Sequence, residues 1–379
     1  MNKNRSIAIQ LAAIPLLIIL SACVPASDLV GVAGNPTEAT IASEPPIVAT
    51  ESPTIVTEAP VVVPTIPAPF GHILFSSERS GKKNLYIMNP LGDGLLRLTN
   101  ADSLDEQARW SPDGRRVAFT STLKDNADIY IVNADGTNLV RVTDDPAKDS
   151  APSWSPDGQR LTFESYRTGD YEIYVVNVDG SGLTRLTTDP AGDSNPQWSP
   201  SGTAIAFVSN RNGNSDIYLV SPDGTHLSAL TNDEARTSNP AWSPDGRTIA
   251  YRASLDGEIA NICLIRADGS DNHCLTAQAG ENGNPTWSAD GTRLTYRATH
   301  NGAVGFDILR VADGNLTSIP VTSVDPRSDP SFAPDGARLI FQAAIDGDVE
   351  IFFIVIDTGE IVRLTSSPSF DGEPAWTGY

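Results

Sequence analysis

The feature that most limits the fold of this chain is a five-residue pattern that returns at a nearly constant interval. Trp-Ser-Pro-Asp-Gly, or a variant of it, begins 44 or 45 residues apart at Trp110, Trp154, Trp198, Trp242, Trp287, Phe332 and Trp376. All six tryptophans of the protein lie on this register. An interval of about 40–45 residues with four short strands is typical of β-propeller blades, and residues 70–379 have room for seven.

Four strands can be placed in each unit. The first strand ends at the aromatic residue, and the Ser-Pro-Asp-Gly turn leads into the second strand, for example residues 116–120. Residues 128–132 then form the third strand, and an Asp-Gly turn leads into the fourth, residues 139–143. The sequence therefore predicts an all-β, seven-bladed propeller of four-stranded blades.

The two ends of the repeat region indicate how the ring closes. The unit that begins at residue 71 has no aromatic pattern before it, whereas Glu373-Pro374-Ala375-Trp376 is a first strand with no second strand after it. We therefore expect the C-terminal strand to complete the first blade, which leaves no open inner edge.

The N-terminal segment has the layout of an export signal. Lys3 and Arg5 precede an apolar run over residues 7–20, which is short for a membrane span. The run ends in Leu20-Ser21-Ala22-Cys23, which resembles the lipobox of bacterial lipoproteins. Residues 1–22 are thus expected to be a lipoprotein signal peptide, with Cys23 as the acylated residue. The alternative is an ordinary signal peptide in which Cys23 is incidental.

Residues 23–69 combine that cysteine with a segment poor in core-forming residues. Nine prolines, six threonines and no lysine or arginine occur between Val24 and Pro69. This composition predicts a disordered linker that tethers residues 70–379 to the membrane surface. The anchor would place the propeller in the cell envelope outside the cytoplasm, at the outer membrane of a Gram-negative cell or otherwise on the outer face of the cytoplasmic membrane.

Charge and composition exclude several classes of partner and cofactor. The 26 basic and 47 acidic residues give a net charge of -21, which argues against nucleic-acid binding and against any membrane contact besides the lipid anchor. Three cysteines and four scattered histidines leave little material for a metal site, so no metal and no cofactor is expected. Catalytic motifs such as Gly-x-Ser-x-Gly are missing, and no catalytic residue is assigned.

The repeat also carries a family resemblance. The Trp-Ser-Pro-Asp-Gly turns, the Asp-Ile-Tyr strands and endings such as Arg185-Leu186-Thr187 resemble the TolB-type (WD40-like) β-propeller repeats over residues 71–379. The resemblance implies a propeller that binds proteins. The chain departs from TolB itself, a soluble periplasmic protein with six blades and a separate N-terminal domain, in its lipobox, its linker and its seven predicted blades.

Two cysteines supply an independent test of the predicted register. Tyr86 and Arg97 are eleven residues apart across the turn between the third and fourth strands, and the same pairing recurs in the next two units. In the fifth unit these two positions are Cys263 and Cys274. Both partners differ together, as a cross-strand disulfide requires, and an exported protein meets oxidising conditions. Two buried free thiols are the alternative.

Candidate binding residues lie on the predicted innermost strand of each blade. We call the residues five places before each blade aromatic the minus-five set and those three places before it the minus-three set. In chain order these sets are Asp105, Asp149, Asp193, Thr237, Asn282, Arg327 and Asp371, and Gln107, Ala151, Asn195, Asn239, Asn284, Asp329 and Glu373. A strand alternates with period 2, so both sets are expected on one side, around the mouth of the central channel.

Acidic residues dominate these two sets, which favours a cationic segment of a partner. The alternative is that the side chains cap loop backbone and are solvated. Arg79, Lys82, Lys83, Lys124, Arg167 and Arg211 form a basic sector in nearby loops. Together these features predict a monomeric, membrane-tethered scaffold that binds a protein or cell-wall partner through its loop face. A carbohydrate- or peptide-degrading enzyme that uses channel carboxylates is the alternative function.

Overall fold

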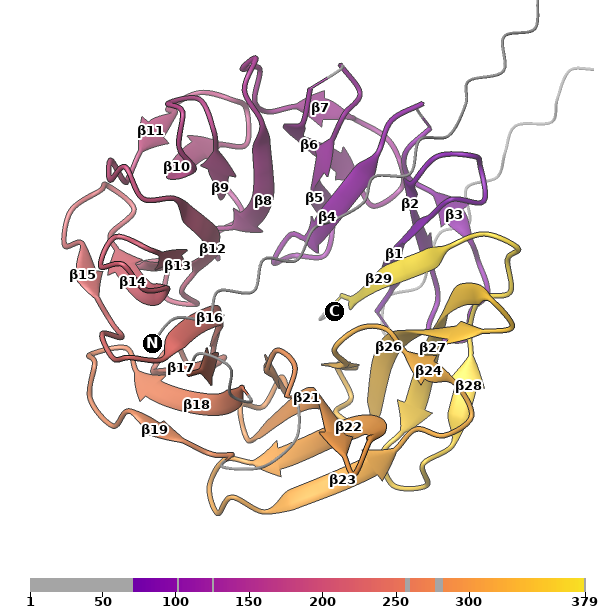
Figure 1. Cartoon of the computed structure of the whole chain (residues 1–379). Helices are drawn as coiled ribbons and strands as arrows, with labels where there is room; N and C mark the ends of the chain where they lie inside the picture. Colours follow the sequence, from indigo (N-terminus) through magenta and orange to yellow (C-terminus); the bar gives the residue numbers. More distant parts are fainter. Residues whose placement is uncertain (1–70, 101, 125, 256–259, 277–281, 378–379) are drawn as a thin grey trace, which may run out of the picture. The chain divides into compact units, whose positions relative to one another are not determined.

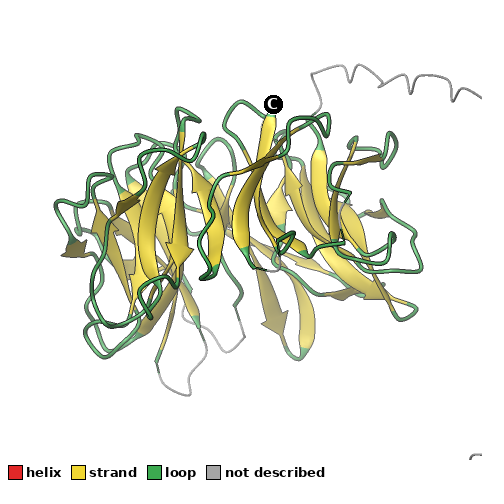
Figure 2. Cartoon of the chain, turned by 90° about the horizontal axis from the view of Figure 1, so that it is seen from above, coloured by secondary structure: helices red, strands yellow, loops and turns green. Residues whose placement is uncertain are grey.

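A computed structural model describes residues 71–377, apart from residues 101, 125, 256–259 and 277–281. In this range the chain forms seven sheets that stand in a ring around a central axis (Figure 1), with the strands running along that axis in the side view (Figure 2). The predicted all-β, seven-bladed propeller is confirmed. The described residues contain no helix long and apolar enough to cross a membrane. Cys23, the signal segment and the linker lie outside the described residues.

Each blade is an antiparallel sheet whose first strand faces the axis (Figure 1). From the axis outward, the first blade contains β29 (Asp371–Trp376), β1 (Ile73–Ser77), β2 (Asn84–Met88) and β3 (Leu96–Arg97). The second contains β4 (Asp105–Trp110), β5 (Arg116–Ser121), β6 (Asp128–Asn133) and β7 (Val140–Arg141). The third contains β8 (Asp149–Trp154), β9 (Arg160–Ser165), β10 (Glu172–Asn177) and β11 (Thr184–Arg185).

The remaining four blades follow the same order. The fourth contains β12 (Asp193–Trp198), β13 (Ile205–Ser209), β14 (Asp216–Val220) and β15 (Ser228–Ala229), and the fifth contains β16 (Arg236–Trp242), β17 (Thr248–Ser254), β18 (Asn261–Arg266) and β19 (His273–Cys274). The sixth contains β20 (Thr286–Trp287), β21 (Arg293–His300), β22 (Ala303–Arg310) and β23 (Leu316–Pro320). The seventh contains β24 (Asp325–Pro326) and β25 (Ser331–Phe332) beside β26 (Arg338–Ile345), then β27 (Asp348–Val355) and β28 (Ile361–Arg363).

The C-terminal strand closes the ring as predicted. β29 pairs antiparallel with β1, with Ile73 opposite Trp376 and Ser77 opposite Asp371. The Thr377 amide donates a hydrogen bond of 2.9 Å to the His72 carbonyl at the end of this pairing. The first blade is therefore built from both ends of the described region.

The Ser-Pro-Asp-Gly turn is held by its own side chains. The Ser111 hydroxyl donates to the Asp113 carboxylate at 2.6 Å, and the Arg116 amide donates to the Ser111 hydroxyl at 2.9 Å. Gly114 adopts a φ of 65°, which a glycine accepts without steric cost. The hydrogen bond from Ser111 lowers the pKa of Asp113, and the equivalent bonds in the sixth blade lower the pKa of Asp290 to about 2. These turns repeat a local structure that the motif alone encodes.

Four of the six blade tryptophans donate an indole hydrogen bond to the preceding blade. Trp154 donates its indole hydrogen bond to the Arg109 carbonyl at 3.0 Å, and Trp287 donates to the Ala241 carbonyl at 2.9 Å. Trp110 makes the same bond to Ala375 at 3.3 Å, across the junction between the two chain ends. The repeated tryptophan thus sets the spacing between neighbouring innermost strands.

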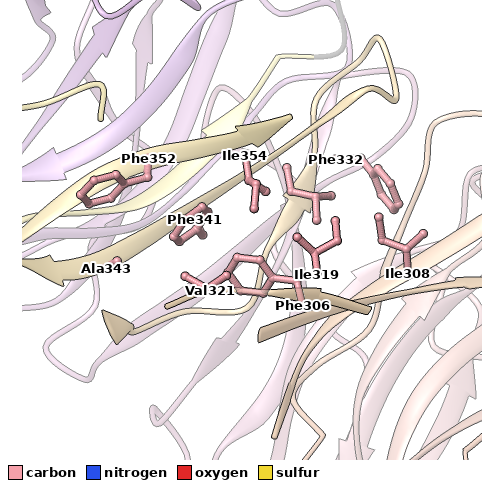
Figure 3. Packing of buried hydrophobic residues seen from close by; sticks show 10 residues of the cluster. Phe306, Ile308, Ile319, Val321, Phe332, Phe341, Ala343, Phe352 and Ile354 are labelled. Carbon is pink, nitrogen blue, oxygen red and sulfur yellow. The ribbon is translucent and has the colours of Figure 1, made fainter. Parts of the chain in front are cut away.

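The hydrophobic core is divided into clusters between adjacent blades. Figure 3 shows the cluster between the sixth and seventh blades, where Phe306 of β22 meets Phe341 of β26 with ring centroids 4.7 Å apart. Phe352 and Ile354 of β27 pack on the same cluster. Burial of each such side chain contributes about 1.5–3 kcal/mol, so every interface between blades carries several such contributions.

The fourth strands are shorter than predicted. Residues 139–143 were expected to form one, but β7 contains two residues, and β3, β11, β15 and β19 have the same length. An outermost strand has no partner on its outer side, and a short strand exposes few unpaired backbone groups. The predicted register is nevertheless confirmed, since Tyr86 lies opposite Arg97 and Cys263 lies opposite Cys274.

Candidate binding site on the ring axis

The minus-five residues begin the innermost strands, and most of them are buried. Asp149, Asp193 and Asp371 have fully buried side chains. Asp193 accepts a hydrogen bond from the Arg211 guanidinium at 2.7 Å, and Arg211 also donates to the Ser209 hydroxyl at 2.9 Å. These carboxylates therefore hold the loop after the second strand of their own blade, and they do not face the axis.

The same arrangement recurs where the loop supplies an arginine. Arg167 pairs with Asp149 at 2.9 Å, and Arg79 pairs with Asp371 at 2.6 Å. Both arginines lie over aromatic rings of their own blades, within 4.6 Å and 5.1 Å of the centroids of Tyr174 and Tyr86. Three members of the predicted basic sector are thus occupied in buried ion pairs.

The other minus-five residues differ from this pattern. Asp105 is buried without an arginine partner and accepts hydrogen bonds from the Ser121 and Ser103 hydroxyls at 2.6 and 2.9 Å. Burial raises the pKa of Asp105, and the hydroxyl bonds act in the opposite direction. Arg327 is exposed and pairs with Asp325 at 2.6 Å in the seventh blade.

A β-bulge separates the two sets, which corrects the expectation that they share one side of the strand. In β12 the register with β13 shifts between Ser194 and Gln197, and Asn195 adopts a φ of 59°. The bulge recurs with φ between 53° and 56° at Gln107, Ala151, Asn239 and Glu373. Because the bulge adds a residue to one strand, period-2 alternation fails there. Apart from the exposed Arg327, the minus-five residues are buried in the blade, while the minus-three residues are half-buried or exposed.

Hydrogen bonds between blades hold these bulges in place. The Gln107 side-chain oxygen accepts from the Ala151 amide at 2.9 Å, and the Glu164 carboxylate accepts from the Asn195 amide at 3.0 Å. The Gln342 side-chain oxygen likewise accepts a hydrogen bond from the Glu373 backbone amide at 2.6 Å. At Ala151, Asn195 and Glu373 the left-handed backbone is therefore held by a side chain of the preceding blade.

Three asparagines of the minus-three set have side chains that the described parts of the surrounding blades do not engage. Asn195, Asn239 and Asn284 lie on consecutive blades and are half-buried. Within the described part of the chain, none of their side-chain amides forms a hydrogen bond. Each amide can donate and accept hydrogen bonds, so these residues present unfilled capacity beside the axis.

The charges around the axis are mixed, whereas the sequence predicted a surplus of acids. Glu373 and Glu106 both contact the Lys83 ammonium, at 3.4 and 3.0 Å. On the far side, Asp329 is close to the guanidinium groups of Arg252 and Arg297, which lower its pKa while burial raises it by more. With Asp149, Asp193 and Asp371 turned away, the axis offers little net negative charge to a cationic partner.

Arg252, Arg297 and Glu164 were missed by the sequence analysis. They occupy one register of the second strands, at positions 76, 120, 164, 208, 252, 297 and 342. The constant interval was a signal that could have found them. Their side chains lie near the axis because each stands opposite the fourth residue before a blade aromatic, as Glu164 does opposite Ser150.

Metal-ligating residues do not gather at this site. In the described residues, no group of three or more histidine, cysteine, aspartate or glutamate side chains is placed to hold a metal ion. Cys263 and Cys274 form a disulfide between β18 and β19, remote from the innermost strand of that blade.

Comparison with known proteins agrees with this architecture. The model of the TolB beta propeller domain matches residues 142–306. Over these residues the propeller resembles the TolB type. TolB from Acinetobacter baumannii is 22% identical with a TM-score of 0.54, over 68% of this chain and 65% of that protein, slightly less than two thirds of its length. No curated protein matches the chain.

Enzymes also share this propeller fold. An oligogalacturonate lyase from Vibrio parahaemolyticus is 16% identical with a TM-score of 0.63, over 74% of this chain and 85% of the lyase. A puromycin-hydrolyzing peptidase from Mycobacterium tuberculosis is 14% identical with a TM-score of 0.62, over 76% of this chain and 50% of the peptidase. Likeness at this level of identity concerns the fold, and the function has to be argued from the site.

Proposed function

We propose that this chain is a binding module of the cell envelope that holds a segment of a protein partner at the loop end of the propeller axis. The proposal joins the TolB-type propeller to the predicted lipid anchor at Cys23 and the predicted linker. In this proposal the minus-three residues contact the partner, and the minus-five residues keep the ring in shape.

The unfilled amides of Asn195, Asn239 and Asn284 carry this proposal. The repeat fixes the same backbone at each bulge, so the side chains vary without loss of the scaffold. Three consecutive blades carry an asparagine at the minus-three position, on the bulge in β12 and β16 and two residues before β20 in the sixth blade. The backbone of a bound peptide matches these side chains, because each peptide group also has one hydrogen-bond donor and one acceptor.

The test compares two double variants. Both replace residues of similar left-handed backbone with glycine, one pair on innermost strands and the other in turns between third and fourth strands. Asn195→Gly with Asn239→Gly removes two axial amides, and glycine accepts the left-handed backbone without strain. Asn138→Gly with His226→Gly is the control, because these exposed residues have φ of 54° and 56° in turns between third and fourth strands. The full chain, immobilised with each pair of substitutions, is exposed to a detergent extract of cell envelopes.

We expect the axial variant to retain its partner at least tenfold less than the wild type, since each lost hydrogen bond costs about 0.5–1.5 kcal/mol. The control should retain the partner unchanged, as quantified by mass spectrometry. Equal retention by both variants would contradict binding at the axis.

The predicted anchor needs a separate measurement. Growth with a radiolabelled fatty acid should label the wild-type chain, and Cys23→Ser should abolish the label and release the protein from membranes. Persistent membrane association of the Cys23→Ser chain would contradict the proposed tether.

The enzymatic alternative receives little support from the site. It relied on channel carboxylates, yet Asp149 and Asp193 have no exposed side-chain surface and are held by arginines. A carboxylate in that position cannot reach a substrate without breaking its ion pair. The shared fold of the lyase and the peptidase therefore does not by itself extend to these residues.

A further inference from the structure

A second ring of side chains surrounds the axis one residue before each blade aromatic. In chain order, this minus-one ring consists of Arg109, Ser153, Gln197, Ala241, Thr286, Ser331 and Ala375. Four of its members are at equivalent places in their blades, because the carbonyls of Arg109, Gln197, Ala241 and Ala375 each accept the indole hydrogen bond of the following blade. Arg109 is the one charged member of a ring of small and neutral residues.

Arg109 has no counterion in the described structure. Its side chain is exposed, although β4 faces the axis and neighbouring innermost strands stand on either side. Its guanidinium donates to the Ala108 carbonyl at 3.1 Å and forms no ion pair with a described carboxylate. Surrounding protein lowers the pKa of Arg109, and the charge of Glu373 opposes this shift. Glu373 is itself engaged by Lys83.

The arginines in the loops after the second strands differ from Arg109 in their partners. Arg79, Arg167 and Arg211 each have a buried carboxylate partner and an aromatic ring beneath them. Arg109 has neither among the described residues, so its positive charge stands uncompensated beside the axis. A guanidinium in this setting is suited to an incoming carboxylate, which it can bind with two parallel hydrogen bonds.

Neutral polar groups complete the ring around it. Gln197, Thr286 and Ser331 are half-buried, and none of their side chains forms a hydrogen bond within the described residues. Ala241 and Ala375 add no hydrogen-bonding side chain. The ring therefore offers one positive charge with hydrogen-bonding groups on other blades.

We propose that Arg109 binds the C-terminal carboxylate of a peptide segment that enters along the axis, with Gln197, Thr286 and Ser331 as hydrogen-bonding neighbours. This rests on the proposed function and adds the chemical class of the ligand. Arg109 follows Gln107 by two positions along β4, and this step spans at most about 7 Å. An extended peptide can therefore contact the minus-three asparagines two residues before its carboxylate reaches Arg109. A chain end fits an axial approach because nothing continues beyond the carboxylate.

The probe is a mixture of hexapeptides with four randomised C-terminal residues, prepared in two forms, as free acids and as C-terminal amides. Immobilised full-length protein is exposed to equal amounts of both forms at low salt, and retained peptides are quantified by mass spectrometry. Arg109→Gln removes the axial charge. Arg115→Gln is the matched control, because it removes the same charge from an exposed turn of the same blade. Thermal melting of both variants verifies that the propeller is folded.

We expect the wild type and Arg115→Gln to retain free acids at least tenfold over amides, and Arg109→Gln to retain both forms equally. Arg109→Lys should give an intermediate ratio, because an ammonium lacks the planar fork. A ratio near one for the wild type, with peptides retained, overturns the carboxylate site and leaves the proposed function standing. Retention of neither form contradicts both the carboxylate site and the proposed binding of a peptide segment. Arg109-dependent retention of an acidic oligosaccharide in place of peptides overturns a peptide as the source of the carboxylate.

Discussion

Two rings of residues on the same strands have opposite roles in this propeller. Asp193 and Asn195 are two residues apart on β12. Asp193 is fully buried against Arg211, whereas the half-buried side-chain amide of Asn195 has no hydrogen-bond partner among the described residues. The bulge between Ser194 and Gln197 causes the difference, because it interrupts the alternation of the strand. In this repeat, the backbone decides whether a polar side chain holds the blade together or faces a ligand.

The comparison shows why acidic composition was a poor guide to the axis. An aspartate in the minus-five set contributes to the net charge of the chain, but its field at the axis is reduced by the adjacent guanidinium. The asparagines of the minus-three set carry no charge and still have hydrogen bonds to offer. The residues that hold the scaffold and those that offer binding groups are thus interleaved within a single strand.

The largest effect is expected from removing both rings of the first blade at once. A chain that ends at Ser369 lacks β29, and with it Asp371, Glu373 and the half-buried Trp376. Loss of a packed tryptophan alone costs about 3–5 kcal/mol, and the inner edge of β1 is left unpaired as well. We expect the free energy of unfolding to fall by more than about 5 kcal/mol, measured by urea denaturation with circular dichroism.

A chain that ends at Thr377 is the control for this truncation, because it keeps the hydrogen bonds to His72. It should unfold like the full-length protein. If the chain that ends at Ser369 also unfolded at the wild-type urea concentration, closure of the ring by β29 would not contribute to stability.

A smaller effect should separate the two rings within one blade. Asp193→Ala leaves the mostly buried Arg211 without its carboxylate, and breaking such a pair costs about 3–5 kcal/mol. Since part of the Arg211 side chain is exposed to water, we expect the free energy of unfolding to fall by about 3 kcal/mol, the lower end of this range. Asn195→Gly should change the free energy of unfolding by less than about 0.5 kcal/mol, because glycine accepts the φ of 59°.

Urea denaturation of both variants measures this difference. Arg211→Met combined with Asp193→Ala is the further control, since it removes the uncompensated charge and should recover part of the loss. Similar losses for Asp193→Ala and Asn195→Gly would show that the two rings do not differ in structural role.

The fold could be predicted from the sequence because its determinants are local and repeated. The aromatic register gave the number of blades, and the unmatched first strand at Trp376 gave the closure. Tyr86 and Arg97 could be paired because the turn between them has a fixed length. Each of these inferences used a short spacing that recurs in several blades.

The candidate site was harder to predict because no residue type marks the bulge. The five minus-three positions with a positive φ carry glutamine, alanine, asparagine or glutamate, and none of them is the glycine that a positive φ usually suggests. One signal for the ion pairs was present, since Arg79, Arg167 and Arg211 occur only in blades whose minus-five residue is an aspartate. Asp105, whose blade has Leu123 at that position, shows that the converse does not hold.

The fifth blade offers a last test of how a blade without this ion pair is stabilised. Its minus-five residue is Thr237, and its third and fourth strands are joined by the disulfide of Cys263 and Cys274. Closing a loop of this length contributes about 2–3 kcal/mol in the chain-entropy account. We expect a reducing agent to lower the free energy of unfolding of the wild type by that amount.

The control is a chain with Cys263→Ala and Cys274→Ala, which should be less stable than the oxidised wild type and insensitive to the reducing agent. The cost should be comparable to that of Asp193→Ala, because each change removes one long-range tie within a single blade. Cys263 is buried and Cys274 is exposed, so the reductant can reach the bridge from the β19 side. A reduced wild type as stable as the oxidised one would mean that the fifth blade is held by its packing against the fourth and sixth blades alone.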